Sequence, residues 1–111
     1  MSDAFAAFLD RRLETLDPEA LRRHQWARIE ALARAAVPAN AFITAQWTRA
    51  GLTGPADLRS WDDFGRLPLT RKSELVADQA AHPPFGRNLS YPLDRYVRVH
   101  QTSGTTGAPL R

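Results

Sequence analysis

The sequence contains no cysteine, a single lysine and no long apolar run. The absence of cysteine excludes disulfides, thiolate chemistry and metal sites built on cysteine. No apolar segment approaches the length needed to cross a bilayer, and the first residues lack the apolar core of a secretory signal. We therefore expect a cytoplasmic, soluble protein that has no membrane partner.

Clustered positive charge is also missing, although the formal net charge is +3. Through Ala36, six arginines are matched by six acidic residues, and the surplus is scattered between Arg49 and Arg111 without a basic run. Surfaces that bind nucleic acid need cations gathered on one face. The sequence therefore indicates no nucleic-acid partner.

The 111 residues are enough for one domain at most, and a hydrophobic content of 43% is typical of a globular chain. Apolar residues at three- and four-residue spacing predict helix in the first half. One apolar stripe consists of Phe5, Phe8, Leu9, Leu13 and Leu16. A second helix is predicted to start at the Asp17 cap and Pro18, and to end before Pro38. Its buried side would carry Trp26, Ile29, Leu32, Ala33 and Ala36.

A third helix is predicted from about residue 39 to 50, with Gly51 as its stop. Residues 51–70 are rich in glycine and proline and indicate turns, with one helical turn after Ser60. Thr70 is predicted to cap a further helix over residues 71–81.

Residues 96–100, with the sequence YVRVH, alternate β-branched and polar side chains and predict a strand. A lone strand needs neighbours for its backbone groups, and no partner strand is evident upstream. The expected fold class is therefore mainly α, with four or so helices and one or two short strands. We expect residues 1–95 to form a helical region and residues 96–111 a strand followed by a loop.

The loop has the sequence Thr102-Ser103-Gly104-Thr105-Thr106-Gly107. Glycines let backbone N–H groups turn toward an oxyanion, and the hydroxyls add donors, so such a loop can hold a di- or triphosphate. It lacks the Gly-Lys-Ser/Thr ending of a Walker A loop. On composition alone, a flexible tail rich in glycine and threonine is the favoured interpretation.

The stretch TSGTTGAP, residues 102–109, resembles the phosphate loop of the adenylate-forming (AMP-binding) ligases. Upstream, LRSWDDFGRLPLTRKSEL, residues 58–75, resembles the segment that precedes this loop in phenylacetate–CoA ligases. Pro84-Phe85-Gly86 and His100-Gln101-Thr102-Ser103 match two further parts of that pattern. The resemblance covers about residues 20–111 and implies an N-terminal piece of the α/β adenylate-forming ligase fold.

The resemblance implies a ligase in which a carboxylate attacks the α-phosphate of ATP, after which the thiol of coenzyme A displaces AMP. It implies that Thr102, Ser103, Gly104, Thr105, Thr106 and Gly107 bind the ATP phosphates. His100 either lines the acyl or nucleotide site or is an ordinary structural histidine. ATP, Mg²⁺ and coenzyme A are implied for the full-length enzyme, with none expected to bind tightly to this chain alone.

The resemblance also implies that the catalytic lysine, the ribose-binding aspartate and the acid that positions magnesium lie beyond residue 111. We therefore expect no catalytic residue and no metal ligand in this chain, and no turnover by it alone. The implied partners are a carboxylic acid substrate of the phenylacetate or aryl acid type and the remainder of the ligase. The alternative is a non-enzymatic helical interaction module, or one half of a split ligase.

Overall fold

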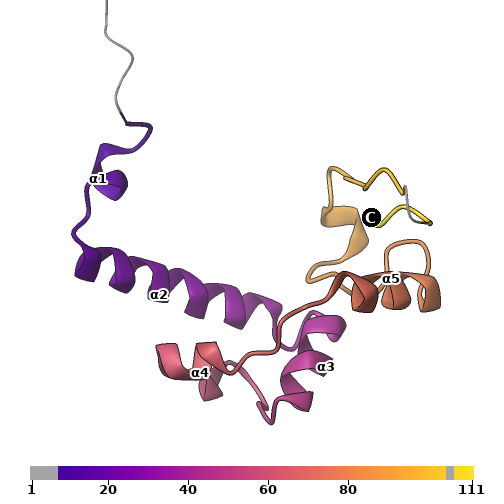
Figure 1. Ribbon diagram of the computed structural model, residues 1–111, viewed down its shortest axis with the longest axis horizontal. Helices are drawn as coiled ribbons and strands as arrows, with labels where there is room; N and C mark the ends of the chain where they lie inside the picture. Colours follow the sequence, from indigo (N-terminus) through magenta and orange to yellow (C-terminus); the bar gives the residue numbers. More distant parts are fainter. Residues whose placement is uncertain (1–7, 105–106) are drawn as a thin grey trace, which may run out of the picture.

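The computed structural model describes residues 8–104 and 107–111, and its regular elements are all helical (Figure 1). In chain order they are α1 (Arg11–Glu14), α2 (Pro18–Ala36), α3 (Ala41–Arg49), the 3-10 turn η1 (Pro55–Asp57), α4 (Trp61–Gly65), α5 (Lys72–Ala81) and the 3-10 turn η2 (Leu93–Arg95). The expectation of a mainly helical chain is confirmed. None of the helices in these residues combines the length and apolar character needed to cross a bilayer.

The start of α2 follows the sequence signals closely. The Asp17 carboxylate accepts a hydrogen bond of 2.7 Å from the Ala20 N–H, and Pro18 is the first helical residue. An Asp cap satisfies an N–H that has no partner within the helix, while proline has no N–H to satisfy there. The helix ends at Ala36, two residues before Pro38, as predicted.

A small apolar core lies where α2, α3 and the following turns meet. Its buried members are Ala33, Val37, Trp47 and Leu58, and the partly buried side chains around them are Trp26, Ile29, Ala36, Ile43, Leu52 and Leu67. Burying a large apolar side chain stabilises the folded chain by about 1.5–3 kcal/mol. This cluster therefore fixes the position of α3 against α2.

Two details of the predicted apolar stripes were wrong. Leu32 is 69% exposed, because α2 is covered on one side only and Leu32 lies beyond the edge of that contact. The first helix is also shorter than its apolar spacing suggests. It begins after Asp10, whose carboxylate accepts from the Leu13 N–H at 3.1 Å, so Phe8 and Leu9 precede it. Phe5 lies outside the described residues.

The short helix α4 packs its first residue against α2. The rings of Trp61 and Trp26 lie 5.4 Å apart, and the Arg22 guanidinium lies 4.8 Å from the Trp61 ring centre. A cation over an indole face is attracted by the ring quadrupole. Figure 1 shows α4 beside α2, away from α5 and the C-terminal chain.

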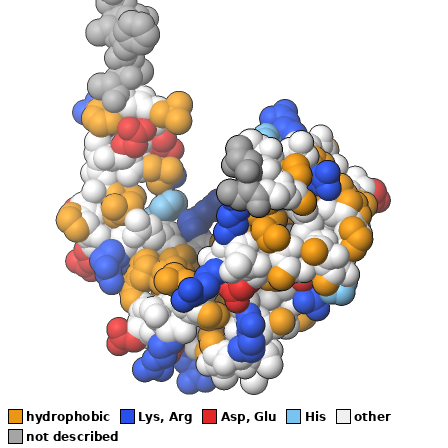
Figure 2. All heavy atoms as spheres, turned by 45° about the vertical axis from the view of Figure 1, so that its right-hand side comes forward, with side chains coloured by type: hydrophobic (Ala, Val, Ile, Leu, Met, Phe, Trp, Pro, Cys, Tyr) orange, Lys and Arg blue, Asp and Glu red, His pale blue; other side chains and the backbone are white. Residues whose placement is uncertain are grey.

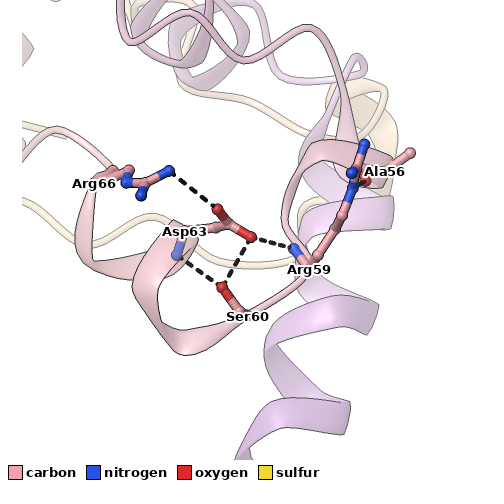
Figure 3. A network of polar contacts seen from close by, with 5 residues as sticks. All are labelled: Ala56, Arg59, Ser60, Asp63 and Arg66. Atoms are coloured by element: carbon pink, nitrogen blue, oxygen red, sulfur yellow. Dashed lines mark hydrogen bonds and ion pairs between the residues drawn. The ribbon is translucent and has the colours of Figure 1, made fainter.

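A polar network at the start of α4 explains why that turn forms where the sequence predicts it (Figure 3). The Asp63 carboxylate accepts hydrogen bonds of 3.0 Å from the Arg59 N–H and from the Ser60 hydroxyl, and Arg66 lies 3.5 Å away. Hydrogen bonds from Arg59 and Ser60 lower the pKa of Asp63 below its ordinary value. Ser60 is the N-cap of α4, because its hydroxyl oxygen accepts from the Asp63 N–H at 3.2 Å.

Helix α5 occupies nearly the predicted span, but Thr70 does not cap it. The Thr70 hydroxyl donates to the Gln46 side-chain oxygen at 3.1 Å, a contact between distant segments that the local sequence does not reveal. Glu74 instead accepts from the Arg71 N–H at 2.8 Å and so satisfies the start of the helix. The same carboxylate meets Arg49 of α3 at 3.3 Å, which links α5 to α3.

The predicted strand at residues 96–100 does not form. Tyr96 has extended backbone angles, but residues 96–100 carry no strand assignment, and the described residues contain no strand for them to pair with. Strand structure needs hydrogen bonds from a neighbour, so an alternating pattern alone cannot produce it. The segment therefore runs as exposed extended chain, with Val97 95% exposed.

Candidate functional site

The segment from Thr102 to Leu110 forms a closed loop above α5 (Figure 1). The Thr102 N–H donates to the Leu110 carbonyl at 2.9 Å, and the Leu110 N–H donates to the Thr102 hydroxyl oxygen at 2.9 Å. Both bonds join the two ends of the loop. The described residues of the predicted phosphate loop, Thr102, Ser103, Gly104 and Gly107, therefore lie in a segment closed by a neck of two hydrogen bonds, which a free tail would lack.

Gly104 occupies a position that only glycine fits without strain. Its φ of +70° lies in the left-handed region, and a Cβ placed there would lie 2.8 Å from the Gly107 carbonyl oxygen. The Gly107 N–H donates back to the Gly104 carbonyl at 3.0 Å. Side chains at φ near +70° are strained, and atoms this close would have to separate. The sequence prediction that these glycines shape the loop has a direct structural basis at Gly104.

The described hydroxyls of the loop are Thr102 and Ser103, and both residues are exposed. The Thr102 oxygen accepts the Leu110 N–H, which leaves its own O–H free to donate outward. Thr105 and Thr106 lie outside the described residues. What the structure brings together is a pair of hydroxyls and a tight glycine turn, a combination that can donate hydrogen bonds to phosphate oxygens.

Gln79 of α5 anchors the loop, and sequence reasoning did not single it out. Its side-chain Nε2 donates to the Pro109 carbonyl at 2.8 Å, and its Oε1 accepts from the Arg111 N–H at 2.7 Å. The Arg111 guanidinium in turn reaches Gln101 at 3.3 Å. A glutamine on a helix gives no local signal of a contact made thirty residues later, so only the fold reveals it.

His100 lines a pocket of about 220 Å³ beside the loop. Most of the pocket wall is apolar and includes Leu75, Phe85, Leu89, Leu93, Val99 and Leu110. Arg98 and Arg111 also line it, so two guanidinium groups and the His100 imidazole border an apolar space. The structure thus places His100 next to the loop neck, while its role stays a prediction.

Below the loop, the buried Asp78 carboxylate joins α5 to the chain that follows it. Asp78 is 7% exposed and accepts from the Arg87 N–H at 2.5 Å and the Arg87 Nε at 2.8 Å. Burial raises the pKa of Asp78, but the hydrogen bonds and charge of Arg87 outweigh this and leave the pKa below its ordinary value. Asp78 is therefore a structural anion at neutral pH.

No group of three or more histidine or acidic side chains that could hold a metal ion occurs within residues 8–104 and 107–111. The Asp63 carboxylate, at the start of α4, already accepts hydrogen bonds from Arg59 and Ser60 and pairs with Arg66 (Figure 3). The described residues accordingly offer glycine and hydroxyl donors for phosphate and no carboxylate set for magnesium.

Comparison with curated proteins identifies relatives over most of the chain. It is 36% identical over 97 residues to the phenylacetate–coenzyme A ligase of Thermus thermophilus, which covers 87% of this chain and 20% of the relative. It is 33% identical over 107 residues to the phenylacetate–coenzyme A ligase of Pseudomonas putida, covering 96% of this chain and 23% of the relative. No family model matches the chain.

Solved structures of a 2-hydroxyisobutyryl-CoA ligase share the same backbone course. The postadenylation state in complex with 2-HIB-AMP matches with a TM-score of 0.84 and 31% identity over 99% of this chain and 22% of the ligase. An open conformation in complex with 2-HIB-AMP and CoA matches with a TM-score of 0.83 and 31% identity, covering 25% of that ligase. The chain therefore spans about a fifth to a quarter of the length of these proteins.

Proposed function

This chain is homologous to the adenylate-forming, phenylacetate–CoA ligase-like enzymes over about a fifth of their length, and from that premise we propose that it forms the N-terminal part of an AMP-forming acid–CoA ligase. In this proposal the chain contributes the phosphate loop, and the reacting groups come from the rest of the enzyme. Residues 1–95 form the helical region, and residues 96–111 belong to the AMP-binding domain.

The closed loop around Gly104 is the single observation that carries the proposal. A positive φ and a Cβ position 2.8 Å from the Gly107 carbonyl require glycine where the resemblance expects a phosphate loop. Thr102 and Ser103 are exposed beside it, and their hydroxyls would bind the β- and γ-phosphates of ATP. Donors that are fixed before the reaction stabilise the charge on departing pyrophosphate.

The proposed substrate is a carboxylic acid of the phenylacetate or aryl acid type, activated by ATP and transferred to coenzyme A. Two phenylacetate–coenzyme A ligases are among its relatives, which supports an aryl acid. Of the residues resolved near the loop, His100 borders an apolar pocket, where a histidine can orient or protonate a polar group. Magnesium would be held by residues that this chain does not supply.

A chimeric enzyme tests the proposal. The matching N-terminal segment of the Pseudomonas putida ligase is replaced by this chain, and phenylacetate-dependent ATP–pyrophosphate exchange and thioester formation are measured. We expect the chimera to be active and its Gly104→Ala variant to lose about tenfold or more of the exchange rate, because a Cβ at this positive φ would displace the hydrogen-bond donors of the loop. Gly54→Ala is the matched control, because a Cβ there meets no atom within 4 Å.

A folded but inactive chimera, or equal rates for the Gly104 and Gly54 variants, would contradict the proposal. The isolated chain should give ATP–pyrophosphate exchange at background with any aryl acid. Clear turnover by the isolated chain would show that the reacting groups lie within these 111 residues.

An interaction module, or one half of a split ligase, is the second candidate function. It is favoured by the apolar side chains that the described residues leave uncovered, such as Val97 and Leu69, which are 95% and 89% exposed. Figure 2 shows apolar side chains at the surface of the lobe that carries the C-terminal chain. Co-expression with a polypeptide that supplies the rest of the ligase fold should then give a stable complex, whereas a monodisperse lone monomer counts against it.

A further inference from the structure

The side chain of Gln79 makes two hydrogen bonds to the backbone at the end of the loop, one as donor and one as acceptor. One end of the amide donates to the Pro109 carbonyl, and the other accepts from the Arg111 N–H. The two contacts flank Leu110, the residue that closes the loop on Thr102. Only an amide side chain of this length provides a donor and an acceptor together at this position.

Gln79 is itself held in place by the chain that returns over the end of α5. Gly86 has a φ of +73°, and a Cβ there would lie 3.3 Å from the Gln79 N and 2.6 Å from the Asp78 carboxylate. The adjacent Asp78–Arg87 pair fixes the same stretch of helix. The backbone of Gln79 is therefore held in place by these contacts. Its side chain in turn holds Pro109 and Arg111 at the neck of the loop.

We propose that Gln79 is a positioning residue that holds the neck of the proposed phosphate loop, where Thr102 pairs with Leu110, in a geometry that favours phosphate binding. The inference rests on the proposed function, since it concerns the same loop. Among the described residues, the Gln79 side chain bonds to Pro109 and Arg111 and to none of Thr102, Ser103, Gly104 and Gly107, so it acts through the former pair. A tethered loop loses less conformational freedom on binding than a free one, and this difference appears as affinity.

The test uses the complete chain, with inorganic pyrophosphate as the probe. Binding is followed by calorimetry and by the shifts of the Gly104 and Gly107 amide NMR signals. Gln79→Glu keeps the length and the acceptor of glutamine but replaces its donor with a second acceptor facing Pro109. We expect Gln79→Glu to bind pyrophosphate about tenfold more weakly, the effect of losing one or two hydrogen bonds.

Gln25→Glu is the matched control, because Gln25 is exposed on α2 and lies far along the chain from the loop. It makes the same chemical change and should bind like the unaltered chain. Urea unfolding of each variant separates positioning from stability, since a positioning role weakens binding while the unfolding midpoint stays the same. Gln79→Asn serves if the glutamate variant does not fold, because it keeps both polar atoms but shortens their reach.

Each outcome decides between the two claims. If the unaltered chain binds pyrophosphate and both Gln79 variants bind it equally well, the positioning role is overturned while the proposed function stands. If the Gln79 variants that bind pyrophosphate more weakly also unfold at a lower urea concentration, Gln79 is a structural residue and the positioning role is overturned. If the unaltered chain gives no shift at Gly104 or Gly107 at any pyrophosphate concentration, the phosphate loop and the role of Gln79 both fall.

Discussion

The region from α2 to α4 and the region from α5 to residue 111 are stabilised by different kinds of contact. In the first, buried apolar side chains such as Trp47 and Leu58 meet in one cluster. In the second, single polar side chains, Asp78 and Gln79, join segments that share little apolar contact. The first region has a small apolar core, whereas the second holds the proposed phosphate loop in place with a few directional hydrogen bonds.

Between the two regions the links are also polar. The buried Asn40 caps α3 through the Ile43 N–H at 3.0 Å and donates to Asn88 at 2.9 Å. It also reaches the Ser90 hydroxyl at 3.2 Å. This buried amide fixes the relative placement of the two regions, because its bonds to Asn88 and Ser90 are lost if either region moves.

The largest expected effect comes from removing the centre of the apolar cluster. Trp47→Ala should lower the free energy of unfolding by about 3–5 kcal/mol, because a large buried side chain is lost and a cavity remains. Urea unfolding followed by circular dichroism measures this loss. Leu69→Ala is the control, since Leu69 is 89% exposed and should change stability by less than about 0.5 kcal/mol. Equal losses for the two variants would show that the apolar cluster does not stabilise the first region.

A smaller effect is expected at the turn that supports Gln79. Gly86→Ala should destabilise the chain by about 1–2 kcal/mol, because alanine is strained at a φ of +73° and its Cβ would press on the Asp78 carboxylate. Gly65→Ala, at the end of α4, meets no atom within 4 Å and should leave stability unchanged or raise it by about 0.5 kcal/mol. A Gly86 variant as stable as the Gly65 variant would mean that the close approach to α5 is dispensable.

The smallest expected effect is the pH dependence of the second region. The folded chain holds the pKa of Asp78 below its ordinary value of 3.8, so this carboxylate stabilises the fold above that pH. The contribution is lost as the pH falls through the lowered pKa. Unfolding measured from neutral pH down to about pH 3 should show stability declining at the acid end. Asp78→Asn should flatten that decline, whereas Asp62→Asn, which changes an exposed carboxylate, should preserve it.

Signals confined to a few neighbouring residues allowed the helix starts to be predicted. Asp17 with Pro18, and Ser60, act within three residues of the N–H groups they satisfy. Contacts between distant segments could not be predicted in this way. Thr70 donates to Gln46 rather than capping α5, and residues 96–100 stay unpaired because a strand depends on a partner elsewhere.

The candidate site shows the same division. Its glycines and hydroxyls are contiguous, so the sequence reveals them together, and the positive φ of Gly104 agrees with the need for glycine. The closure of Thr102 on Leu110 and the tether from Gln79 join residues that lie eight and thirty positions apart. Neither the threonine nor the glutamine carries a local sequence signal that predicts its distant partner.

The distribution of aromatic residues gives each region its own optical reporter. All three tryptophans, at positions 26, 47 and 61, belong to the region around the apolar cluster, and both tyrosines, Tyr91 and Tyr96, belong to the other. The two tyrosine rings lie 6.4 Å apart, and the Tyr96 hydroxyl accepts from the Ser90 N–H at 2.9 Å. Fluorescence excited at the red edge of the aromatic band, where tyrosine does not absorb, thus follows the melting of the tryptophan-bearing region alone, without any added label.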